Sequence, residues 1–161
     1  MKKFPDAKLG IGPTIENGFY YDFKLPRSLA PDDLKEFERT MKKFVGGKLI
    51  FGGKKVSTAE AKKIFKNQPF KLDLIKEFAQ EKKQLTVYET GVSDAKGQMS
   101  DIYFTDLCRG GHVENTSEIN VDAFKLDKIA GAYWRGSEKN PMLQRIYGLA
   151  FATKEDLDAH L

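Results

Sequence analysis

The fold class of this chain is decided by the stretch LGIGPTIENGFYYDF, residues 9–23. Two short runs of apolar and aromatic residues lie on either side of Glu16-Asn17-Gly18. Asn-Gly between two such runs is the strongest short-range signal of a β-hairpin, because both residues tolerate positive φ. The stretch therefore predicts an antiparallel hairpin near the N-terminus.

Helices are predicted to alternate with further strands along the rest of the chain. Apolar residues at steps of three and four, with capping residues or proline at the start, predict helices that begin at Pro31, at Ser57, after Pro69 and after Thr153. Strands are predicted over residues 48–51, 54–56, 85–89, 101–107 and 121–130, the last continuing to 136, and Gly52-Gly53 is predicted as a turn. Residues 142–151 fit a strand or a short helix. This order predicts one α+β domain over residues 1–161, with a largely antiparallel β-sheet and packed helices.

The composition indicates a globular, water-soluble protein. Charged residues make up 31% of the chain and the mean hydropathy is -0.50. No apolar run approaches the ~20 residues of a membrane span, and the N-terminus lacks the apolar core of a signal peptide. We therefore expect a cytoplasmic location and no membrane partner. The single cysteine, Cys108, excludes an internal disulfide and is expected to be a free thiol.

The charge is mildly basic, with a net value of +4 and a pI near 9.0. Lysines occur in pairs at 2–3, 42–43, 54–55, 62–63 and 82–83. A solvated helix face explains any one pair, and together they are compatible with a polyanionic partner without requiring one.

One stretch carries chemistry, the sequence DLCRGGH from Asp106 to His112. Its thiol and imidazole are close enough to converge as metal ligands or as polar groups of a small reaction site. Taken alone, the Cys-x3-His spacing fits a structural cysteine and histidine better than a functional pair. Lys71, expected in the first turn of the third helix, would by itself be an ordinary solvated lysine.

Three strings together give these residues another meaning: IGPTIENGFYYD at 11–22, DLCRGGHV at 106–113, and GAYWRG at 131–136 with MLQRIYG at 142–148. In this order they closely resemble the N-terminal editing domain of bacterial-type threonyl-tRNA synthetase. Related domains occur in alanyl-tRNA synthetase and in free-standing trans-editing proteins. The ATP-dependent catalytic domain and the anticodon-binding domain of that family are absent from these residues.

The resemblance implies hydrolysis of serine wrongly esterified to threonine tRNA. A pocket built for threonine rejects the smaller serine by only ~1–3 kcal/mol, so a second site must remove it. By motif, Lys71, Asp106 and His112 are the implied catalytic residues, and Tyr21, Cys108 and Arg109 are implied in substrate binding. We hypothesise that Lys71 stabilises the oxyanion, His112 holds or activates water, and Asp106 orients the substrate amine.

Two departures from the family pattern affect the implied site. Gly111 replaces the family's proline, which loosens the loop before His112. The family also carries a His-x3-His pair just upstream of the position matched by Phe4-Pro5, and this sequence starts after it. Cys108 and His112 are then two ligands where a stable zinc site uses three or four. We expect no tightly bound cofactor, and zinc only if the upstream histidines are present.

Three functional hypotheses remain open at this point. The first is a part of threonyl-tRNA synthetase with weak editing activity in isolation, whose partners are the acceptor end of tRNA(Thr) and the other synthetase domains. The second is a non-catalytic tRNA-binding module that uses the lysine pairs on phosphates. The third is a free-standing trans-editing deacylase. The sequence ends inside a predicted helix, which favours the first.

Overall fold

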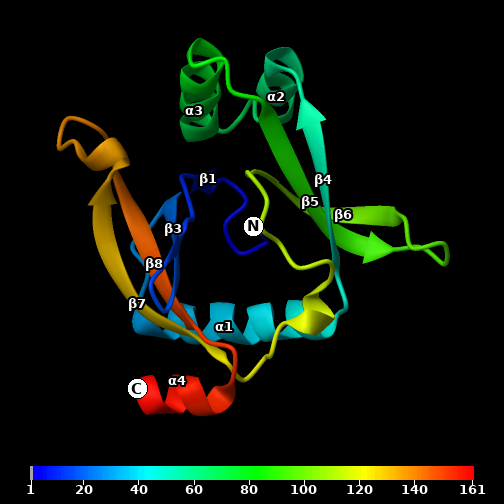
Figure 1. Ribbon diagram of the computed structural model, residues 1–161. Coiled ribbons are helices and arrows are strands. Elements are labelled where there is room, and N and C mark those ends of the chain that lie inside the picture. The colour runs from blue at the N-terminus through cyan, green and yellow to red at the C-terminus, as the bar shows by residue number, and fades with distance from the viewer. Residues whose placement is uncertain (1) are drawn as a thin grey trace. The chain divides into compact units, whose positions relative to one another are not determined.

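The computed structural model describes residues 2–161 and divides the chain into two compact units (Figure 1). The first unit comprises the residues up to Lys42 together with Asn120–Leu161, and the second comprises Lys43–Ile119. Each unit has its own sheet and its own helices.

The sheet of the first unit has the strand order β1 (Lys8–Leu9), β3 (Gly18–Lys24), β8 (Met142–Ala150), β7 (Phe124–Tyr133), and all neighbours are antiparallel. The short strand β2 (Thr14–Ile15) pairs with the start of β3. Asn17 connects them with a φ of 62°, the left-handed conformation that the Asn-Gly signal requires. The predicted hairpin is therefore confirmed.

Helix α1 (Pro31–Gly46) supplies the apolar partner of this sheet. Its Leu34 forms a buried cluster with Leu126 of β7 and Ile146 of β8, and the aromatic rings of Phe19 and Phe23 pack around the cluster. The C-terminal helix α4 (Lys154–His160) begins after Thr153, whose hydroxyl accepts a hydrogen bond from the Asp156 N–H. Both helix starts agree with the sequence pattern.

The second unit is built on a three-stranded antiparallel sheet of β4 (Ile50–Val56), β5 (Leu85–Ser93) and β6 (Met99–Leu107), with β5 in the centre. Helices α2 (Thr58–Ile64) and α3 (Pro69–Gln80) lie next to each other at one end of β4 and β5 (Figure 1). Their buried residues Ala61 and Ile75 share a core with Leu85 and Val87 of β5. A 3-10 turn, η1, follows at Thr116–Glu118.

The structure confirms the α+β class and corrects three local predictions. Gly52-Gly53 is not a turn but lies inside the continuous strand β4. The strand expected from residue 121 begins at Phe124, because residues 121–123 form a turn. Its expected continuation to 136 ends at Tyr133, where the 3-10 turn η2 (Trp134–Gly136) begins and Arg135 has a φ of 55°. The segment left open as strand or helix is the strand β8.

None of the helices described over residues 2–161 is both long and apolar enough to cross a membrane.

Candidate functional site

The end of β6 positions the first part of the candidate site in the second unit. Asp106 lies directly opposite Tyr88 of β5, so the two side chains are on the same face of the sheet. Beyond the last strand residue, Leu107, the Cys108 N–H still donates to the Thr86 carbonyl at 3.1 Å. The backbone from Asp106 to Cys108 is therefore held by the sheet.

Lys71 of α3 is paired with Asp106. The Lys71 Nζ lies 2.7 Å from Asp106 Oδ1, and the side chains are 3% and 18% exposed. The same oxygen accepts the Leu107 N–H at 2.8 Å. Lys71 is thus a buried partner of the candidate aspartate and not the solvated lysine that its helix position alone suggested. Solvent reaches the pair mainly through the carboxylate.

Cys108 and His112 meet across the loop that follows β6. The Cys108 Sγ lies 3.1 Å from His112 Nε2, and the Gly110 N–H donates to the sulfur at 3.5 Å. The chain turns back because Gly110 and Gly111 have φ values of 113° and 82°, in the left-handed region that glycine adopts without strain. The predicted thiol–imidazole pair therefore forms. Its cysteine lies two residues after Asp106, the aspartate that pairs with Lys71.

Two aromatic residues that the sequence did not single out contact His112. Its imidazole centroid is 4.4 Å from the Tyr88 ring, and it stacks on the Phe51 ring at 5.2 Å with an interplanar angle of 19°. The only sequence signal for them was Gly52-Gly53 within an apolar strand, since glycine inside a strand indicates a close approach by another group.

Arg109 and Tyr21, the other two predicted substrate-binding residues, are not part of the contacts of Lys71, Asp106, Cys108 and His112 described above. Arg109 is exposed, and its guanidinium lies 5.8 Å from the centre of the Phe78 ring of α3. Tyr21 belongs to the first unit, where its ring stacks on Phe23 at 4.8 Å. The cluster described in the second unit therefore consists of Lys71, Asp106, Cys108 and His112, with Arg109 at its exposed edge.

The donor set does not fit a resident metal. Within residues 2–161, no group of three or more His, Cys, Asp or Glu side chains is arranged to hold a metal ion. Cys108 and His112 provide two donors.

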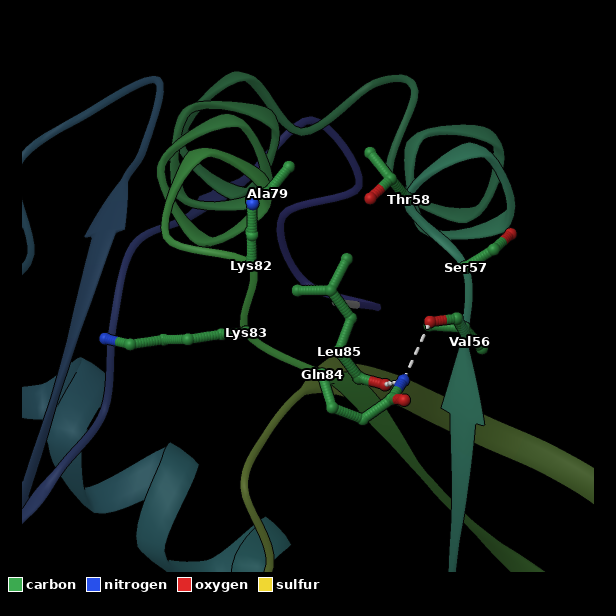
Figure 2. A pocket seen from close by; sticks show the side chains of 8 residues that line it. All are labelled: Val56, Ser57, Thr58, Ala79, Lys82, Lys83, Gln84 and Leu85. Atoms are coloured by element: carbon green, nitrogen blue, oxygen red, sulfur yellow. Dashed lines mark hydrogen bonds between the residues drawn. The ribbon is translucent and has the colours of Figure 1, made fainter.

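A cavity of about 310 Å³ lies elsewhere in the second unit, between the start of α2 and the end of α3. Figure 2 shows its eight lining residues, with Gln84 Nε2 donating to the Val56 and Leu85 carbonyls and the Lys83 side chain extending away from Ser57 and Thr58. No residue of the Lys71–His112 cluster lines this cavity, so the candidate site lies outside it.

Comparison with known proteins defines the class of the chain as a tRNA synthetase domain. Residues 85–147 match the model of the family described as the threonyl and alanyl tRNA synthetase second additional domain. The matched range contains Asp106, Cys108 and His112. The chain belongs to this family, and its threonyl members are the ones it resembles over its whole length.

The curated relatives are named threonine–tRNA ligase. The ligase of Dehalococcoides mccartyi is 50% identical over 161 residues, which are 100% of this chain and 25% of the relative. The ligase of Thermotoga petrophila is 50% identical over 157 residues, 97% of this chain and 22% of the relative. That of Bifidobacterium longum is 44% identical over 167 residues, 98% of this chain and 24% of the relative. The chain spans about a quarter of the length of these relatives.

Proposed function

We propose that this chain is the editing part of a cytoplasmic threonine–tRNA ligase and that its Lys71–His112 cluster hydrolyses serine from mischarged tRNA(Thr). The observation that supports the proposal is the pairing of a buried lysine with Asp106 two residues before a cysteine in contact with His112. In ester hydrolysis by water, an imidazole can activate the water, a cation can stabilise the oxyanion and a carboxylate can orient the substrate.

The reaction adds water to the ester carbonyl carbon and expels the terminal ribose hydroxyl. Nε2 of His112 faces the Cys108 sulfur at 3.1 Å, which leaves Nδ1 as the ring nitrogen that can hold the attacking water. As the oxygen–carbon bond forms, the water loses a proton to the imidazole. The proton then passes to the departing ribose oxygen as its bond to the carbonyl carbon breaks.

The negative charge that develops on the carbonyl oxygen needs a nearby cation. Lys71 can provide it, because its ammonium is a cation with three N–H donors and lies 2.7 Å from Asp106 Oδ1, at the candidate aspartate. Charge–charge attraction is stronger at a site with little solvent, and the Lys71 side chain is 3% exposed. Asp106 is the more exposed member of the pair, so its carboxylate can accept hydrogen bonds from the serine ammonium.

Deacylation of Ser-tRNA(Thr) tests the proposal, with Thr-tRNA(Thr) as the substrate to be spared. The assay uses this chain and a version extended at its N-terminus by the family's His-x3-His segment. We expect hydrolysis of the seryl ester, stronger in the extended version, and at least tenfold slower after Lys71→Met. Lys76→Met is the matched control, because Lys76 is an exposed lysine on the same helix.

Two outcomes would contradict parts of this proposal. Binding of tRNA without hydrolysis in both versions would make the chain a non-catalytic module and end the proposal. A Lys71→Met rate equal to that of Lys76→Met would remove Lys71 from the mechanism.

A further inference from the structure

We infer that Tyr88, assisted by Phe51, is the positioning residue of the site: its ring holds the imidazole of His112 with Nε2 towards the Cys108 sulfur. The geometric part of this inference stands on the contacts within the second unit. Its consequence for catalysis rests on the function proposed above.

The register of the sheet places Tyr88 beside the candidate site. Tyr88 lies on the central strand, with Gly53 of β4 opposite on one side and Asp106 of β6 on the other. Side chains at directly opposed positions project from the same face. Tyr88 is therefore next to the candidate aspartate and on the face from which the Cys108–His112 loop continues.

Two glycines leave the space that the Tyr88 ring occupies. A Cβ atom built on Gly53 would lie 2.6 Å from Tyr88 Cζ, so the ring lies across this glycine. A Cβ built on Gly110 would lie 2.8 Å from the Tyr88 hydroxyl oxygen, so the tip of the side chain touches the loop. Glycine at these two positions allows the ring to bridge from β4 to the loop that carries His112.

His112 is exposed as a residue, and its one hydrogen-bonding contact among the described residues is with Cys108. A side chain held by a single contact would rotate about its χ angles. The Tyr88 ring at 4.4 Å and the Phe51 ring at 5.2 Å restrict this rotation. Aromatic contacts of this kind stabilise a side chain beyond the effect of buried area, and they therefore favour one orientation of the imidazole.

The test uses the histidine signals of the chain in NMR spectra. The sequence has only two histidines, so ¹³C,¹⁵N-histidine labelling with a His160→Gln variant assigns the His112 ring directly. We expect Tyr88→Leu to move the His112 ring signals and to change the balance of its two ¹⁵N shifts, which reports the tautomer. Tyr88→Phe, which keeps the ring, should retain the original signals.

A pair of neighbouring glycines provides a sharper version that leaves Tyr88 and His112 unchanged. Gly53→Ala would place a methyl group within 2.6 Å of the Tyr88 ring and displace it, whereas the methyl of Gly52→Ala would meet only the flexible end of Met99 at 3.5 Å. Gly53→Ala is expected to move the His112 signals in the direction of Tyr88→Leu, and Gly52→Ala is expected not to. This pair also replaces Tyr88→Leu should that variant fail to fold.

The kinetic arm measures deacylation of Ser-tRNA(Thr). Displacing a catalytic group by about 1 Å can cost up to about 100-fold, so Tyr88→Leu is expected to lower kcat by about tenfold or more with little change in KM. In a His112→Ala background the same substitution should have no further effect, because the two residues act as one unit.

Two results would overturn the inference: His112 signals that are unchanged in Tyr88→Leu, or signals that move as much with Gly52→Ala as with Gly53→Ala. If the parent chain does not deacylate the tRNA, the proposed function fails. The NMR comparison still decides whether Tyr88 positions His112.

Discussion

Removing the charge of Lys71 should destabilise the fold through Asp106, and the size of the effect can be worked out from the pair. Lys71 is 2% exposed, and the Asp106 side chain is 18% exposed. Breaking a buried ion pair from one side costs about 3–5 kcal/mol, because the other charge remains without its counter-ion. Asp106 keeps its hydrogen bond from the Leu107 N–H and some contact with solvent, so the lower figure applies.

Lys71→Met, which keeps the length of the side chain, is therefore expected to cost about 3 kcal/mol, or roughly 6–12 °C in Tm at about 2–4 °C per kcal/mol. Asp106→Asn should cost a similar amount, because it removes the carboxylate charge that pairs with the buried ammonium. The double variant should cost about 1–3 kcal/mol less than the sum, since both charges are then gone.

Urea denaturation followed by circular dichroism measures all three variants, with Lys76→Met as the control at an exposed site of α3. The control is expected to stay within about 0.5 kcal/mol of the parent chain. The reasoning is refuted if the two single costs add to within about 0.5 kcal/mol in the double variant, or if Lys71→Met unfolds at the same urea concentration as the control.

Four further predictions follow from the structure. Arg27, the Ala30 N–H and Lys3 hold the pKa of Asp33 well below its usual range, so the stability that Asp33 contributes is present at neutral pH and is lost as the pH falls below about 4; Asp33→Asn should flatten this acid limb in urea titrations. Gly111→Ala places a side chain at a φ of 82° and should cost about 1–2 kcal/mol in the same assay. Cys108→Ala should leave measurable deacylation. No seryl adduct should form on the protein, and an adduct trapped on Cys108 in the parent chain would contradict the water mechanism. Zinc per chain after gel filtration should be far below one, and a stoichiometric value would show a metal site.

Local signals in the sequence predicted most of the secondary structure. Asn17-Gly18 formed the expected turn, and Ser57 forms a complete capping box with Glu60 at the start of α2. Gly52-Gly53 was misassigned as a turn because glycine pairs usually interrupt strands. In the structure β4 continues through both glycines because it pairs with β5 along its length, and the ring of Tyr88, 35 positions after Gly53, fills the space beside that glycine. Such a cause is not visible in a local window.

The candidate site also combines residues that the sequence predicts with contacts that it does not predict. The family motif predicts Lys71 as a site residue. Nothing near Lys71 in the sequence predicts that it is buried against Asp106, 35 residues further on. Tyr88 and Phe51 were not predicted at all, because their contact with His112 depends on the register of β4, β5 and β6. The sequence predicts candidate site residues, and the packing of α3 and the register of β5 and β6 determine which of them meet.

The Cys-x3-His spacing acquires its geometry from the loop backbone. Cys108 is held by β5, and two successive left-handed glycines return the chain so that His112 meets the sulfur. Proline restricts φ to about −65°, far from the 82° seen at Gly111. Gly111→Pro should therefore break the Cys108–His112 contact or re-route the loop, and the His112 ring signals would report either change.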